Sequence, residues 1–164
     1  MVNNLPKRKA MRWSEFDYNS SCAVFVTICV KDRRQILSNI VLSEKTNLPV
    51  VELTSIGKII QKNILSTENI KGVLVDKYVI MPDHVHIIFA IKDAANTKLF
   101  MRHNAILPRV VSAFKRFCNK EIGENIFQRS FYDHIIRDSE DYDIRSNYIN
   151  ENPLKWYYNP QGTL

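Results

Sequence analysis

Residues 77–89 read Lys-Tyr-Val-Ile-Met-Pro-Asp-His-Val-His-Ile-Ile-Phe, and this stretch decides how the rest of the chain is interpreted. Most of it is apolar and either β-branched or aromatic, which is typical of strands. The dipeptide Pro82-Asp83 interrupts the run, because this pair favours a tight turn. We therefore expect two strands, over residues 73–81 and 84–91, joined by that turn.

His84 and His86 are the strongest chemical signal in this stretch. Alternate residues of a strand share a face, so the two imidazoles are predicted to project side by side while Val85 points into a core. Burying both is costly unless hydrogen bonds within the fold satisfy them or a metal ion binds them. Zinc hydrolases also use such a pair, but they need further ligands, and His103 and His134 lie in no second cluster. A metal site here would need groups from elsewhere in the chain.

The composition is that of an ordinary globular chain with a basic excess. The 164 residues are enough for one domain with a substantial core, and 45% apolar and 24% charged residues are usual values. The net charge of +6 favours polyanionic partners. Three cysteines without a C-x-x-C pair suit a reduced, cytoplasmic protein, and no apolar run is long enough to cross a membrane. We expect a single cytoplasmic domain over residues 1–164.

Hydrophobic spacing predicts seven elements in the order strand, helix, strand, strand, helix, strand, helix. This order is that of a ferredoxin-like (RRM-like), split βαβ fold of the α+β class, with an antiparallel four-stranded sheet, two covering helices and an added C-terminal helix. Residues 1–20 are expected to form a basic arm, and residues 138–164 the added helix and a tail. The added helix should end before Pro153, because proline interrupts helices. The elements outside the strand pair are expected over residues 22–30 (strand), from Thr54 or Ser55 (helix), from Pro108 to Gly123 (helix), over 131–137 (strand) and over 139–152 (helix).

The added helix carries two groups that could complete a histidine site. Tyr148 and Asn152 are four residues apart and therefore share a helix face. A phenol becomes nucleophilic when a cation polarises its target or a neighbour assists its deprotonation, and an amide oxygen can bind a metal. Taken alone, the spacing fits better a tyrosine that packs and an asparagine that ends a helix. Among rival tyrosines, Tyr142 lies between two acidic residues, and Tyr157 and Tyr158 lie beyond the predicted helix.

Basic residues gather in two parts of the chain. Residues 98–129 contain seven Lys and Arg against two Glu, and a second basic cluster lies in the N-terminal arm. These groups are either solvated charge or a surface for nucleic acid, and phosphate contact would make binding weaken steeply with added salt. The residues predicted to contact nucleic acid are Lys7, Arg8, Lys9, Arg12, Arg102, Arg109, Lys115, Arg116 and Arg129.

Several separated segments resemble the IS200-like, single-tyrosine (Y1) transposases, a family of HUH endonucleases. Residues 78–86, Tyr-Val-Ile-Met-Pro-Asp-His-Val-His, are similar to the family's HUH segment. Residues 128–137, Gln-Arg-Ser-Phe-Tyr-Asp-His-Ile-Ile-Arg, and 148–153, Tyr-Ile-Asn-Glu-Asn-Pro, resemble its later segment, especially in the REP-associated tyrosine transposase branch. Residues 25–34 also match the usual first strand and its exit. The likeness spans nearly the whole chain, with the motifs in the family's order.

The resemblance implies a transposase that cleaves and rejoins single-stranded, hairpin-forming DNA. It implies that His84, His86 and Asn152 bind a divalent metal, and that Tyr148 is the nucleophile that forms a 5′-phosphotyrosine. Asp83 stands where Asn is common in the family, and its side chain is expected to point away from the metal. Mg²⁺ or Mn²⁺ is expected from the family, although imidazole ligands would also suit Zn²⁺.

Two other functions remain open at this stage. One is a catalytically silent protein that binds nucleic acid on the same fold, and the other is a zinc hydrolase that uses only the His pair. The residues also leave open whether the tyrosine helix serves its own chain or the site of a partner in a homodimer.

Overall fold

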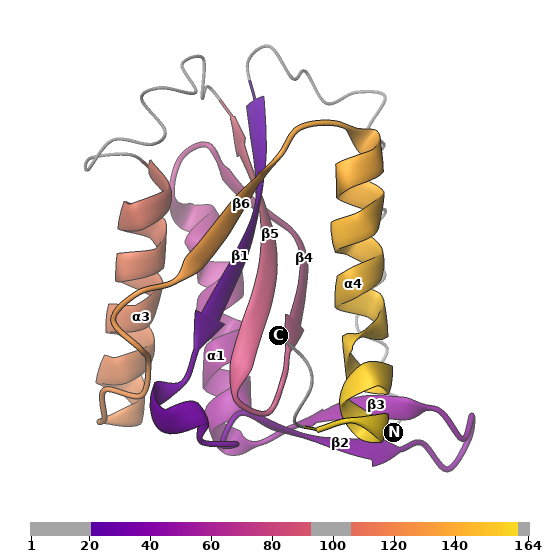
Figure 1. The fold of residues 1–164 in the computed structure, drawn as a ribbon. Coiled ribbons are helices and arrows are strands. Elements are labelled where there is room, and N and C mark those ends of the chain that lie inside the picture. The colour runs from indigo at the N-terminus through magenta and orange to yellow at the C-terminus, as the bar shows by residue number, and fades with distance from the viewer. Residues whose placement is uncertain (1–20, 93–105, 161–164) are drawn as a thin grey trace.

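Apolar runs of the sequence become six strands and three α-helices in the computed structural model, which describes residues 21–92 and 106–160 (Figure 1). The predicted strands and helices agree with six of these elements to within a few residues at each end. In chain order the elements are β1 (Ser21–Cys29), β2 (Ser38–Leu42), β3 (Pro49–Leu53), α1 (Ser55–Ser66), β4 (Val73–Ile80), β5 (His84–Lys92), α3 (Ile106–Ile122), β6 (Tyr132–Ile136) and α4 (Ser139–Tyr158).

Four strands form one sheet in the order β4-β5-β1-β6. All three pairs of neighbours are antiparallel, and the two most apolar strands, β1 and β5, are central. The first helix joins β1 to β4 and the second joins β5 to β6, which is the split βαβ connectivity. The predicted ferredoxin-like α+β fold is confirmed.

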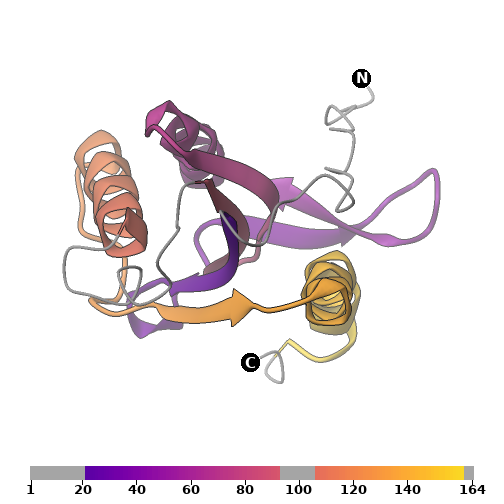
Figure 2. The same cartoon turned by 90° about the horizontal axis from the view of Figure 1, so that it is seen from above.

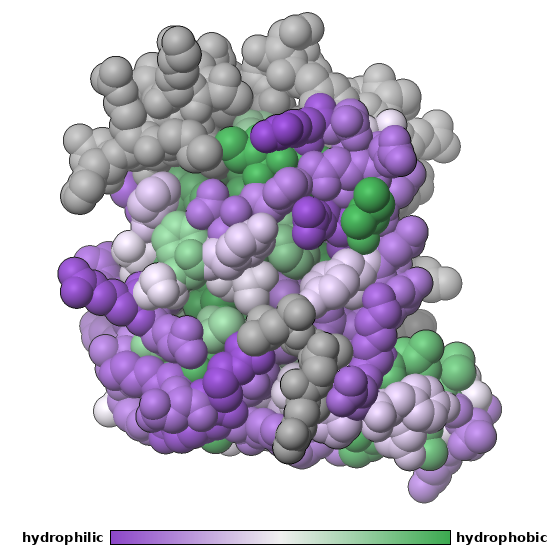
Figure 3. Space-filling view, viewed as in Figure 1, coloured by the Kyte–Doolittle hydropathy of each residue, from purple (hydrophilic) through white to green (hydrophobic). Residues whose placement is uncertain are grey.

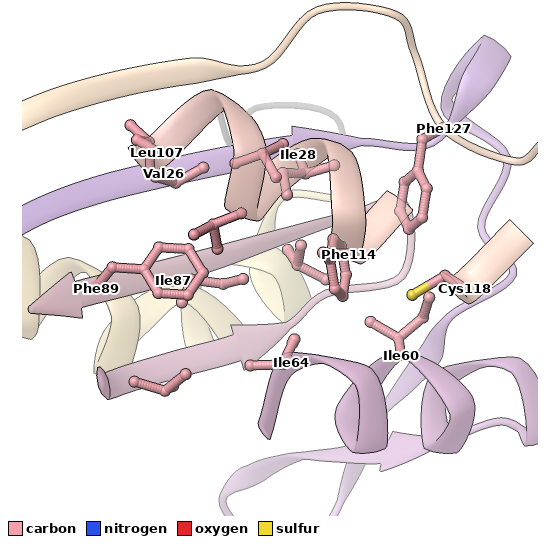
Figure 4. Packing of buried hydrophobic residues seen from close by; sticks show 14 of the residues in the cluster. Val26, Ile28, Ile60, Ile64, Ile87, Phe89, Leu107, Phe114, Cys118 and Phe127 are labelled. Carbon is pink, nitrogen blue, oxygen red and sulfur yellow. The ribbon is translucent and has the colours of Figure 1, made fainter. Parts of the chain in front are cut away.

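The sheet lies between two helical layers. Seen from above, α1 and α3 cover one face and α4 covers the other (Figure 2). Strand β1 sends Val26 and Ile28 toward α1 and α3, where Phe114 and neighbouring apolar side chains fill the core (Figure 4). Each buried side chain of this size contributes about 1.5–3 kcal/mol. The second face of the sheet is covered by a smaller cluster that includes Ile149 and Trp156 of α4.

The start of α1 shows a close approach that only glycine allows. The hydroxyl of Thr54 accepts a hydrogen bond from the backbone N–H of Gly57 at 3.0 Å, which confirms the predicted N-cap. A Cβ added at Gly57 would overlap the carbonyl oxygen of Leu37. The helix therefore packs directly against the backbone that leads into β2.

A β-hairpin made of β2 and β3 was not predicted. The two strands pair antiparallel as a separate two-stranded sheet. Ile40 and Val51 pack against the α4 cluster, whereas other apolar side chains of the hairpin are exposed and give the green surface at its end in Figure 3. Because both faces of the hairpin carry apolar residues, its sequence does not alternate between apolar and polar residues, and the two strands could not be recognised from a period of two. The exposed ones are Val41, Leu42, Leu48 and Val50.

Helix α4 continues through Pro153 to Tyr158, which corrects the prediction that it ends before the proline. Proline has no N–H, so the carbonyl of Ile149 loses its helical donor. Beyond the proline, Trp156 is buried against the sheet, and this packing offsets the lost hydrogen bond. Asn152 thus lies inside the helix and not on its last turn. Neither α4 nor another helix in the described part of the chain is long and apolar enough to cross a membrane.

Candidate active site

The two histidines lie on the α4 face of β5, side by side as predicted. His84 is fully buried and His86 almost so. Their Nε2 atoms are 3.0 Å apart, and the rings are inclined by 72°. Val85, between them, points into the core on the opposite face. Two buried imidazole nitrogens therefore converge on one point.

The outer nitrogen of each ring is held by a neighbouring side chain. His84 Nδ1 donates to Asp83 Oδ1 at 2.5 Å, and the other carboxylate oxygen accepts from Arg33 Nε at 2.8 Å. Because a carboxylate only accepts, Nδ1 of His84 carries a proton, and Nε2 is the nitrogen that faces His86. His86 Nδ1 is 2.8 Å from the hydroxyl of Thr27 on β1. Such supporting bonds fix metal-binding histidines in orientation.

The protonation of His86 also suits a ligand. Burial, the adjacent His84 and the charge of Arg33 together lower the pKa of His86 well below its usual value. At neutral pH this imidazole is therefore uncharged, which is the form that binds a cation.

Helix α4 presents three residues to the histidine pair from one face, because they are spaced four apart. The ring of Tyr148 lies 5.2 Å from that of His86, and the ring of Trp156 lies 6.0 Å from that of His84. Asn152 lies between them on the helix and is fully buried. Its Oδ1 has no hydrogen-bond partner among the described residues. The structure thus brings all four predicted site residues together within one chain.

Strand β4 and a short connection fix α4 over its own sheet. Lys77 Nζ donates to Ser146 Oγ at 2.6 Å and to Asn150 Oδ1 at 3.2 Å, and Tyr142 Oη donates to Asp76 Oδ2 at 2.7 Å. Only two residues separate β6 from α4, and they can span roughly 11 Å. Tyr142, the nearest rival nucleophile, is buried in this contact.

The donor set at this point fits a divalent cation. The described residues contain no cluster of three or more His, Cys, Asp and Glu side chains that could hold a metal. What they do contain is two imidazole nitrogens facing each other and, from α4, a buried amide oxygen without a partner. A buried acceptor without a partner is costly, and a bound cation would satisfy it. His84, His86 and Asn152 are the residues that would hold the ion.

A pocket of about 540 Å³ opens beside Tyr148, between α4, β1 and the segment that leads into β6. Its walls are largely aromatic, and they include one arginine, Arg145, which was not predicted as a site residue. A substrate in this pocket would contact both the phenol and the edge of the histidine pair. The lining residues are Phe25, Thr27, Cys29, His86, Gln128, Ser130, Phe131, Tyr132, Arg145 and Tyr148.

Sequence reasoning missed three supporting residues. Thr27 and Arg145 come from elements far from the histidines in sequence, and only the sheet register could have indicated Thr27, since it pairs with His86. Asp83 was expected to point away from the metal. Its carboxylate does lie at Nδ1, away from the Nε2 pair, but there it orients His84.

The predicted DNA-contacting residues are spread over the molecule. Arg109, Lys115 and Arg116 lie on α3, which covers the opposite face of the sheet from the histidines, and Arg129 is exposed before β6. Lys115 donates to the backbone carbonyls of residues 128, 129 and 130, at 2.8, 3.2 and 2.9 Å, so its charge holds the segment that lines the pocket. Five predicted residues lie outside the described part of the chain: Lys7, Arg8, Lys9, Arg12 and Arg102.

Comparisons with known proteins agree on one family. Residues 18–152 match the family model described as "Transposase IS200 like". An uncharacterized protein of Haemophilus influenzae is 29% identical over 171 residues, which cover 91% of this chain and 89% of its own. A second protein of that organism, named "Putative REP-associated tyrosine transposase", is 33% identical over 88 residues, 48% of each chain.

One solved structure is similar in fold. It is titled "Structure of the REP associates tyrosine transposase bound to a REP hairpin" and has a TM-score of 0.62 and 20% sequence identity. The match covers 91% of this chain and 73% of that one.

Proposed function

Because this chain belongs to the family of IS200-like transposases, enzymes that nick and join DNA, we propose that it does so on single-stranded DNA through a covalent bond between DNA and Tyr148. The observation that supports this most is the placement of Tyr148 and Asn152 over His84 and His86 within one chain. The phenol lies partly exposed in a pocket, while the groups that would hold a cation are buried beside it.

The chemistry requires few groups. Tyr148 Oη attacks the phosphorus as its proton leaves, the bond from phosphorus to the 3′ oxygen breaks, and that oxygen leaves as a 3′-hydroxyl after taking up a proton. A divalent cation, when bound, supplies Lewis-acid stabilisation of charge on the phosphate. The 5′-phosphotyrosine keeps the phosphodiester in activated form, so a second 3′-hydroxyl can displace Tyr148 and join two strands without ATP.

The substrate that we propose is hairpin-forming single-stranded DNA, and the ion Mg²⁺ or Mn²⁺. The solved relative was bound to a REP hairpin, and this chain carries a net charge of +6, which favours a polyanion. Two imidazoles and an amide oxygen also suit Zn²⁺.

The test is to trap the covalent product. A labelled pool of single-stranded hairpin DNA is incubated with the protein and Mn²⁺, and the adduct is mapped by mass spectrometry. Wild type and the control Tyr157→Phe, an exposed tyrosine of the same helix, should form an adduct on Tyr148 and release a 3′-hydroxyl end, whereas Tyr148→Phe should form none. Cleavage without an adduct would indicate a hydrolase, and DNA binding without cleavage would indicate a silent binding protein.

A further inference from the structure

Arg145 lies in the pocket beside Tyr148. The two residues are three apart on α4 and therefore share a helix face. The guanidinium carbon of Arg145 is 5.6 Å from the centre of the Phe25 ring, which itself lies 6.0 Å from the Tyr148 ring and 5.1 Å from the His86 ring. The Phe25 ring thus contacts the guanidinium, the phenol and the imidazole together.

The carboxylate of Asp141, which also contacts His134, holds the Nε side of the arginine. Arg145 Nε donates to Asp141 Oδ1 at 3.4 Å, and His134 Nε2 lies 2.7 Å from Asp141 Oδ2. Burial alone would raise the pKa of Asp141, but the hydrogen bonds it accepts, chiefly from His134, lower the pKa below its usual value. Asp141 therefore stays ionised and fixes the guanidinium at its Nε side.

No described residue forms a hydrogen bond with the opposite edge of the guanidinium, which is therefore the edge that we consider for a ligand. In residues 21–92 and 106–160, Asp141 is the one hydrogen-bond partner of the Arg145 side chain. Arg145 is also the only permanently charged residue among the described residues that line the pocket. With Nε occupied, the two Nη groups can donate in parallel, which is the geometry that matches two oxygens of a phosphate.

We propose that Arg145 binds the scissile phosphodiester beside Tyr148 and is a second catalytic residue, with Asp141 and His134 as its positioning residues. This rests on the proposed function of the site. As the bond from Tyr148 Oη to phosphorus forms and the bond to the 3′ oxygen breaks, the non-bridging oxygens carry the negative charge. A guanidinium fixed in advance stabilises that charge without reorganising.

The first experiment compares two linkages. The substrate is the oligonucleotide mapped in the adduct assay, with its scissile phosphate either natural or replaced by an uncharged methylphosphonate. Arg145→Gln should slow adduct formation by about 10²- to 10³-fold on the natural linkage, the loss typical of one oxyanion donor, and by far less on the uncharged one. Arg145→Lys should be intermediate on the natural linkage. Equal losses on both linkages would overturn the proposal, because they would mean that Arg145 only supports the fold.

Two controls make this result specific. Lys58→Gln removes one exposed charge from α1, on the far face of the sheet, and should leave the rate unchanged. Asp141→Asn should slow the reaction on its own but add little to Arg145→Gln, since both act through one guanidinium. If the rate loss of the double variant equals the product of the two single losses, Asp141 does not act through Arg145, and its positioning role is overturned.

The second experiment does not depend on catalysis. Binding of single-stranded oligo(dT) to Tyr148→Phe protein is measured in EDTA over a range of salt concentrations. Adding Arg145→Gln should reduce the slope of log K against log salt by about 0.7, the value for one lost phosphate contact on a single strand, and adding Lys58→Gln should not. An unchanged slope would overturn the phosphate contact. A reduced slope without any adduct in wild type would uphold it while refuting the proposed cleavage.

Discussion

Replacing Asn152 by leucine should stabilise the metal-free protein and remove its response to metal. Asn152 is fully buried, and its Oδ1 has no partner among the described residues. Its amide nitrogen makes one long hydrogen bond, 3.5 Å, to the carbonyl of Tyr148. An unpaired buried acceptor costs about 1–3 kcal/mol, whereas a leucine of similar branching leaves no polar atom unpaired. The Asn152→Leu protein should therefore gain about 1–3 kcal/mol of unfolding free energy.

The assay is thermal unfolding of wild type and variant in EDTA and in MnCl₂. Without metal, the Tm of Asn152→Leu should exceed that of wild type by about 2–4 °C for each kcal/mol of unfolding free energy gained. With Mn²⁺ at 100 times its Kd, wild type should gain about 2.7 kcal/mol, and the variant much less. The exposed Asn147→Leu serves as control and should behave as wild type in both buffers. A variant less stable than wild type in EDTA, or one that keeps the whole Mn²⁺ gain, would refute the reasoning.

Three further outcomes follow from the structure. Burial raises the pKa of Asp76 although Tyr142 donates a hydrogen bond to it, so the free energy of unfolding of wild type should fall as pH rises from about 4 through that raised pKa. In urea unfolding, Asp76→Asn should not show this fall, and an Asp76→Asn protein less stable than wild type at pH 7 would contradict the prediction. Gly57→Ala should cost about 1–3 kcal/mol or more by the same measurement, because the added methyl overlaps the carbonyl of Leu37; unchanged stability would show that the contact yields. Iodoacetamide at pH 8 should modify Cys29 alone, since burial of the other two thiols raises their pKa to about 11 and about 12; mass spectrometry of the peptides reads this out.

The sequence predicted best what depends on local periodicity. The period of two in residues 77–89 correctly placed both histidines on one face and Val85 on the other. The spacing of Tyr148 and Asn152 correctly predicted a shared helix face. Such patterns involve residues within one element, where geometry follows directly from the backbone repeat.

What could not be predicted depends on packing between distant segments. Thr27 orients His86 across 59 residues of sequence, and only the sheet register brings them together. The chain passes through Pro153 in helical form because Trp156 gains burial beyond it, a tertiary effect that outweighs local propensity. Arg145 was not predicted as a site residue, because its place in the pocket depends on Phe25 of strand β1.

The placement of α4 over its own sheet determines how activity should depend on the amount of protein. The proposed nucleophile, the residues that would hold the cation and Arg145 all come from one polypeptide, and the two-residue connection before α4 keeps them together. If the site acts as proposed, it is complete without an encounter between copies. Adduct formation per molecule should then stay constant on dilution, so that a cell holding only a few copies of the chain retains the full activity of each.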